Sequence, residues 1–157
     1  MVNSGEKIID YIAGIMRAGF GVRGYEVLGV GKVITSENAM LFTSKGILFI
    51  TVPLPGAETM VSGVDIPMWQ WLLAKKDIES KTKEMISSMS AERILKSNPK
   101  NYYVSYEEIK AVKFGWKFLF FSSTTISITR NDGKTLKYTI RDKQDFERAK
   151  VILKRFS

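Results

Sequence analysis

The 157-residue sequence predicts one α+β domain built on a bent antiparallel sheet, or partly open barrel, of about seven strands. Strands are indicated after Lys100, where apolar and polar residues alternate and the turn signal Asn131-Asp132-Gly133 separates two alternating runs. A C-terminal capping helix is indicated from Asp142 onward, because apolar residues recur there at helical spacing within a charged segment. This stripe consists of Phe146, Ala149, Leu153 and Phe156. The composition, 45% hydrophobic and 25% charged, is that of a globular protein.

The N-terminal region predicts a short helix over residues 5–18. Asn3 and Glu6 have the spacing of a capping box, and the apolar residues that follow are spaced as on one face of a helix. The glycines between residues 19 and 24 end this helix, so residues 1–24 form an N-terminal helix with a glycine-rich linker. Residues 25–34 then begin the β-rich part of the chain.

A tight hairpin is predicted next, with strands at 39–43 and 46–52. Both segments are short apolar runs, and Ser44-Lys45-Gly46 joins them. Gly46 is expected to supply a positive φ angle in this turn.

Residues 53–100 are a helical insertion in the sheet. Three of the four prolines mark a loop over 53–67, and 68–96 reads as one long helix or two helices broken near Ser87-Ser88. The stripe of this helix is interrupted by Lys75 and Thr82, and it predicts a buried Trp71 beside a more exposed Trp69. The other stripe residues are Met68, Ile78, Met85 and Met89. Together with this insertion, residues 1–157 are expected to form a single domain.

The residue types exclude several chemistries. The chain contains no histidine and no cysteine, which removes imidazole and thiolate ligands, thiol nucleophiles and histidine-based acid–base catalysis. No carboxylates have metal-ligand spacing, so we expect no enzyme activity, no metal and no cofactor. A cytoplasmic location is expected because the N-terminus lacks a signal-peptide pattern.

The net charge of +8 is unevenly distributed along the sequence. Residues 101–157 contain 12 basic and 6 acidic residues, whereas residues 1–66 contain 5 and 6. A positive surface built from the last third of the chain would attract phosphates on lipid or nucleic acid. The alternative is a solvated face that only keeps the protein soluble.

Three stretches resemble the microbial members of the pleckstrin-homology-like superfamily, including GRAM-type domains. These stretches are ENAMLFTSKGILFITV, YYVSYEEIKAVKF and TISITRNDGKTLKYTIRDKQDFERAKVILKRF. In that group a T-x-x-x-[IL] hairpin precedes a [VI]-x-Y-x-x-I strand start, matched here by Val104, Tyr106 and Ile109. The resemblance covers residues 25–157 and implies a module that binds lipid headgroups or peptides. The basic cluster with which relatives bind phosphoinositides is not matched on the first strands, where only Lys32 is basic.

The polar face of the last hairpin is the main candidate binding surface. Thr125, Ser127, Thr129, Thr135, Lys137, Thr139 and Arg141 are expected to point outward. The ligand-binding residues predicted on and near this face are Lys113, Lys117, Arg130, Lys134, Lys137 and Arg141.

The start of the long helix is a second candidate surface. Trp69, Lys75 and Lys76 have the composition of an interfacial helix, in which tryptophan lies at headgroup depth and lysines meet phosphate. The same helix could pack on its own sheet or form a homodimer seam.

Two functional hypotheses follow. The first is a non-enzymatic binding or scaffold module that contacts an anionic membrane surface or a protein partner, peripheral to the membrane in the former case. The alternative is a nucleic-acid-binding protein that uses the basic sheet, with Tyr102, Tyr103, Tyr106 and Trp116 as stacking groups.

Overall fold

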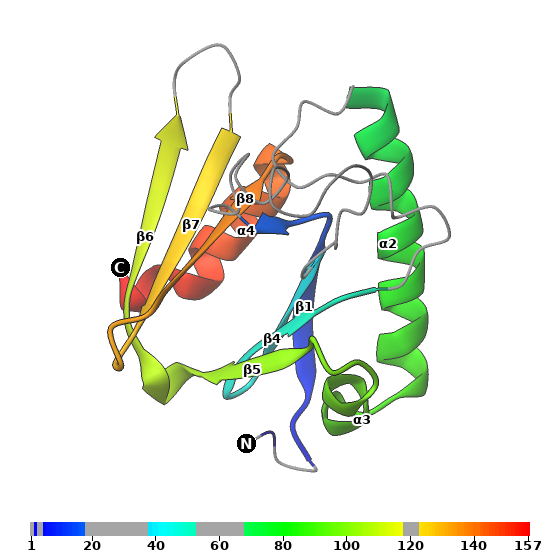
Figure 1. Cartoon of the computed structure of the whole chain (residues 1–157), viewed down its shortest axis with the longest axis horizontal. Helices are drawn as coiled ribbons and strands as arrows, with labels where there is room; N and C mark the ends of the chain where they lie inside the picture. Colours follow the sequence, from blue (N-terminus) through cyan, green and yellow to red (C-terminus); the bar gives the residue numbers. More distant parts are fainter. Residues whose placement is uncertain (1, 3–4, 18–37, 53–67, 118–122) are drawn as a thin grey trace, which may run out of the picture.

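The chain folds into an α+β structure of antiparallel strands with a C-terminal helix, as the sequence predicted. The computed structural model describes residues 2, 5–17, 38–52, 68–117 and 123–157 (Figure 1). Its strands are β1 (Ile8–Ala13), β2 (Met16–Arg17), β3 (Ala39–Thr43), β4 (Gly46–Ile50), β5 (Tyr102–Ser105), β6 (Ile109–Lys117), β7 (Ser123–Arg130) and β8 (Thr135–Ile140). Its helices are α2 (Met68–Ser88), α3 (Ala91–Lys96) and α4 (Lys143–Leu153), with 3-10 turns at Tyr106–Glu108 and Lys154–Phe156. The stretch 25–34, predicted to be β-rich, lies outside the described residues.

The strands form two four-stranded sheets, and the chain passes from one sheet to the other at two places. The first sheet has the order β1-β3-β4-β5 and the second has the order β2-β8-β7-β6. The chain passes from one sheet to the other at Gly14, which has φ +76°, and again at the 3-10 turn between β5 and β6. Because β5 and β6 do not pair with each other, the two sheets do not close into a barrel.

The predicted N-terminal helix over residues 5–18 is wrong, because residues 8–13 form strand β1. Ile12 and Ile15 are three residues apart and both buried in the same core, which looks like helical spacing. The spacing arises because the bend at Gly14 lies between them and carries the chain into the second sheet. Glu6 does not cap a helix but is buried, accepting hydrogen bonds from Thr43 Oγ1 and from Tyr103 Oη at 2.6 Å.

The insertion packs on the first sheet of its own chain. Helix α2 ends at Ser88 and α3 begins after the N-cap Ser90, so the predicted break near Ser87-Ser88 is confirmed. Ile78 of α2 and Ile94 of α3 are fully buried against one face of the first sheet. The sheet residues in this cluster are Ala13, Ala39, Leu41, Leu48 and Ile50. Of the described stripe residues, Ile78 and the partly buried Met85 pack on the protein's own sheet, whereas Met89, just beyond the end of α2, is 38% exposed.

The main core lies between the two sheets and α4. Phe146, Ala149 and Leu153 of α4 are buried there, and Phe156 packs against them, as the apolar stripe predicted. Asp142 is the N-cap and accepts from the backbone N–H groups of Gln144 and Asp145. Both faces of the first sheet are thus covered, which is why every residue of β3 and β4 is buried. Figure 1 shows this layering, with β6, β7 and β8 to the left, β1 and β4 in the middle and α2 to the right.

Both predicted hairpins are present, although Gly46 has a different role from the one expected. Positive φ occurs at Gly14 and Gly133 among the described glycines, and Gly46 is not one of them. A Cβ on Gly46 would lie 2.5 Å from the Tyr103 ring and from the Val104 carbonyl oxygen. Gly46 is required because β5 approaches closely, whereas Gly133, with φ +83°, is required by the β7–β8 turn.

Candidate functional site

The outward surface of the second sheet brings two predicted lysines into one row. Lys113 of β6 lies opposite Ser127 of β7, and Ser127 lies opposite Lys137 of β8. The neighbouring row consists of Ala111, Thr129 and Thr135, in which the two threonine hydroxyls are 3.1 Å apart. We call these six residues the Lys113–Lys137 face. Two strand spacings separate the lysine backbones, which is roughly 10 Å.

The Lys113–Lys137 face is positive and open to solvent. Lys113 and Lys137 are exposed, whereas their neighbours on the same strands, Val112 and Tyr138, are buried in the core. Strands β6, β7 and β8 contain no aspartate or glutamate. Within the part of the chain that the structure describes, neither lysine has an ion-pair partner. The outward prediction is confirmed for Lys137 and Thr135, which are exposed, and for the half-buried Ser127 and Thr129. Thr125 is instead buried, with 7% of its surface exposed.

The remaining predicted ligand-binding residues do not join this row. Arg130 pairs with Glu108 at 3.1 Å and with Asp132 at 3.7 Å, so its charge is used within the fold. Lys134 is exposed at the β7–β8 turn, and Arg141 is half-buried after β8. The Lys117 side chain lies outside the described residues.

Lys75, predicted to meet a membrane or partner, is instead part of an internal ion-pair network. Its ammonium group lies 2.9 Å from Asp142 and 2.7 Å from Asp145, and only 13% of its side chain is exposed. Asp145 also binds Arg148, which reaches Asp10 on β1. The network therefore connects α2, α4 and β1. The sequence did not reveal it, because each of its aspartates lies in an ordinary helix or strand pattern.

Electrostatics reinforce this network. Burial alone would lower the pKa of Lys75, but its hydrogen bonds to Asp145 and Asp142 outweigh burial and raise it. Burial alone would raise the pKa of Asp142, but the bonds from Lys75 and from backbone N–H groups lower it. The hydrogen bond to Asp10 raises the pKa of Arg148. These ions are held in their charged forms over the neutral range.

The other residues of the second candidate surface are only partly described. Lys76 is exposed, as are Leu72 and Leu73 beside it. The side chains of Trp69 and Trp71 lie outside the described residues, and so does the prediction about their relative burial.

The predicted stacking tyrosines pack against their own protein. Tyr102 stacks on Phe49 with ring centroids 4.8 Å apart, and Phe49 stacks on the buried Tyr138. Tyr106 stacks on Phe156 and carries the Arg155 guanidinium 4.2 Å from its ring centroid. The Trp116 side chain lies outside the described residues.

Tyr103 belongs to a polar cluster at the end of the first sheet. Burial, and next to it the hydrogen bond to Glu6, raises the pKa of Tyr103 well above its ordinary value. Thr43 accepts from the Gly46 N–H at 2.9 Å and also meets Glu6. This cluster fastens the N-terminal segment to β3 and β5, and the sequence hid it because Glu6 resembles a capping residue.

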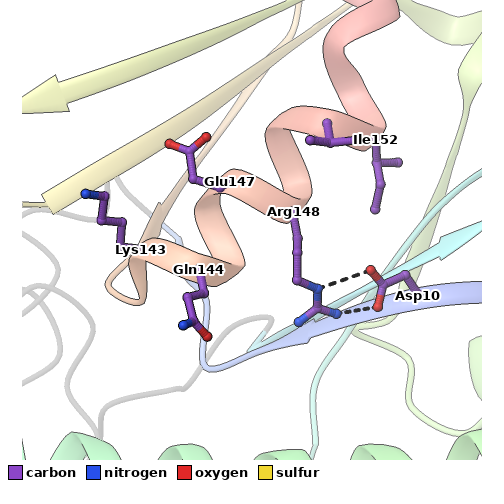
Figure 2. Close-up of a pocket in the computed structure, with 7 residues that line it drawn as sticks. Asp10, Lys143, Gln144, Glu147, Arg148 and Ile152 are labelled. Atoms are coloured by element: carbon purple, nitrogen blue, oxygen red, sulfur yellow. Dashed lines mark hydrogen bonds and ion pairs between the residues drawn. The ribbon is translucent and has the colours of Figure 1, made fainter.

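A shallow groove of about 530 Å³ runs between α4 and β1 (Figure 2). It is lined by Asp10 and by six residues of α4 between Lys143 and Ile152. Figure 2 shows Arg148 reaching from the helix to Asp10 on the strand. No two of the side chains that line the groove combine a nucleophile with a general base.

Among the described residues, no three acidic side chains gather as metal ligands, and none of the helices has the length and hydropathy of a membrane span. Comparison of the chain with protein-family models, with curated proteins and with solved structures gives no match in any of the three.

Proposed function

We propose that the protein is a non-enzymatic binding module that contacts an anionic membrane surface through the Lys113–Lys137 face. The observation that carries this proposal is the row of Lys113, Ser127 and Lys137 across three adjacent strands. Two ammonium groups flank a hydroxyl on strands that contain no acidic side chain. Phosphate oxygens would accept hydrogen bonds from all three groups and balance both charges.

A pleckstrin-homology-like fold is part of this proposal, and the strand order supports it. If β1 and β2 are taken as one strand bent at Gly14, the described residues form seven antiparallel strands followed by α4. The bent strand pairs with β3 in one sheet and with β8 in the other. The insertion then lies between the third and fourth strands. The resemblance in sequence covers residues 25–157, whereas the first strand of this arrangement starts earlier, at Ile8.

The Lys113–Lys137 face is better suited to bind lipid headgroups than nucleic acid. Single-stranded nucleic acid binds to basic grooves in which exposed aromatic rings stack on bases. Tyr102 and Tyr106 are partly buried in stacks with Phe49 and Phe156, away from the outward face of β6–β8. A flat face of hydroxyls and lysines matches a layer of phosphates, which requires charge and no stacking.

Co-sedimentation with vesicles tests the proposal. We expect the protein to bind vesicles containing phosphatidylserine, to ignore phosphatidylcholine vesicles, and to dissociate as salt is raised. Lys113→Gln combined with Lys137→Gln should weaken binding roughly 30-fold, given about 1 kcal/mol for each lysine near an anionic surface. Lys76→Gln combined with Lys83→Gln on α2 is the matched control and should retain binding.

Each alternative gives a different result in this assay. Binding lost only in the α2 variant would place the membrane surface on the helix and overturn the sheet assignment. Absence of binding to any vesicle would overturn the membrane proposal. An oligonucleotide that binds more tightly than the vesicles at the same salt concentration would favour the nucleic-acid hypothesis.

A further inference from the structure

Two aliphatic side chains at or next to the groove between α4 and β1 are unusually exposed. Val151 of α4 lines the groove with 76% of its surface exposed. Ile9 is 67% exposed and precedes the groove residue Asp10 on β1, where the pairing of β1 with β3 is irregular. Exposed aliphatic groups beside a groove are typical of an interaction surface.

Strand β1 gives this surface the hydrogen-bonding edge of a sheet. Among the strands that the structure describes, it is the end strand of the first sheet and pairs with β3 on one side. On its other side, the Tyr11 N–H donates to Asp10 Oδ1 at 2.8 Å, and the Tyr11 carbonyl accepts from Arg148 Nη2 at 2.9 Å. Two side chains thus occupy the positions that an adjacent strand would take, which is a common way to protect an edge in the free protein.

The charges along the groove are balanced and alternate in sign. Lys143 and Arg148 are basic, and Glu147 and Asp10 are acidic. A chain with a net charge of +8 repels its own copies over most of its surface. At a neutral patch carrying both signs that repulsion is weakest, and each charge can meet its opposite on a second copy.

We propose that this groove is a homodimer interface in which β1 and α4 of one protomer meet the same elements of its partner across a two-fold axis. Antiparallel pairing of the two β1 edges would extend the first sheet across the axis. Asp10 and Arg148, which pair within the protomer, would exchange partners across it. Val151 and Ile9 would be removed from water. This surface is separate from the Lys113–Lys137 face, so the dimer does not depend on the proposed membrane function.

Sedimentation velocity over a wide range of protein concentration tests the interface with the full chain. We expect a monomer–dimer equilibrium, and Val151→Lys should raise its dissociation constant at least tenfold, since a two-fold interface acquires the new charge twice. Ile9→Lys should act in the same direction. Both sites are exposed, so melting temperatures should not change.

Leu73→Lys on the outward face of α2 is the matched control, because it makes the same change at an exposed leucine. It should leave the dimer intact. A protein that remains monomeric at every concentration contradicts the proposal, and so does a dimer that Leu73→Lys weakens while Val151→Lys does not.

Discussion

Single residues in this fold act through the elements they connect, and Lys75 is the clearest example. Its stem packs over the Gly14 bend, 3.2 Å from where a Cβ on that glycine would be, and its charge meets Asp142 and Asp145. It therefore joins α2 to the start of α4 and to the crossing between the sheets.

Lys75→Met keeps the stem and removes the charge. We expect it to lower the free energy of unfolding by roughly 2 kcal/mol, less than the ~3–5 kcal/mol of a fully buried pair because Asp142 is partly exposed. Denaturation in urea measures the change. Lys76→Met, one residue further along on the exposed face, should stay within about 0.5 kcal/mol. Equal stability of both variants would show that the network contributes nothing.

The same pair predicts how stability depends on pH. Because the folded pKa of Asp142 is lowered, its contribution is complete above the unfolded value of about 3.9 and is lost as pH falls through the folded pKa. Because the folded pKa of Lys75 is raised, its contribution is complete below about 10.4 and is lost as pH rises through the folded pKa.

The difference in melting temperature between wild type and Lys75→Met should accordingly be constant from about pH 5 to 9 and shrink at both extremes. A difference that changes within the neutral range is not compatible with these two groups, since the chain contains no histidine to titrate there.

Two glycines provide a second test at the residue scale. Gly46→Ala should cost at least about 2 kcal/mol, because its Cβ collides with the Tyr103 ring and a backbone oxygen. Gly133→Ala should cost about 1 kcal/mol through its positive φ alone, and Gly133→Asn less. Asparagine at position 46 should not improve on alanine. If it did, strain in φ rather than collision would explain Gly46.

At the scale of elements, sequence patterns succeeded where local signals and burial agree. The β7–β8 hairpin and α4 were predicted because a turn residue or cap coincides with a clean period of two or of 3.6. The N-terminal strand was not, since its two faces are both covered and the bend at Gly14 shifts the alternation. Its partner, β3, begins 26 residues after β1 ends, and no local pattern indicates such a pairing.

The candidate site was predictable to the same extent. Alternation places Ser127 and Lys137 on the outward face, which the structure confirms, and the strand pairing adds Lys113, which the sequence placed only near this face. Alternation cannot reveal that Arg130 is neutralised by Glu108, or that Lys75 meets two carboxylates of a helix about 70 residues later. Such pairings depend on how distant elements pack, which composition does not encode.

Helix α4 is expected to be essential for folding. Truncation before Asp142 removes Phe146, Ala149 and Leu153 from the core. Burial of each of the two larger side chains contributes roughly 1.5–3 kcal/mol, whereas the free energy of unfolding of a typical domain is about 5–15 kcal/mol. It also leaves Lys75 without its carboxylates. We expect no cooperative thermal transition in this truncation by circular dichroism, and a cooperative one would contradict the role assigned to α4. Val151→Ala, an exposed change in the same helix, should melt as wild type does.

At the scale of the whole molecule, two surfaces compete for a membrane. Figure 1 shows β6, β7 and β8 on one flank and α2 on the other, with β1 and β4 between them. The Lys113–Lys137 face belongs to the first flank, and the exposed Leu72, Leu73 and Lys76 belong to α2. A flat bilayer cannot contact both flanks of one protomer at once. We assign the membrane contact to the sheet, because the lysines there have no acidic neighbours on their strands.

Paramagnetic relaxation measured by NMR on the labelled protein, with vesicles that contain phosphatidylserine and a gadolinium-bearing lipid, tests this assignment most directly. We expect the amide signals of Lys113, Ser127, Thr129 and Lys137 to lose intensity, while those of Leu72 and Leu73 persist. Loss confined to the α2 signals, or no loss on the sheet at vesicle concentrations where the protein is bound, would contradict it.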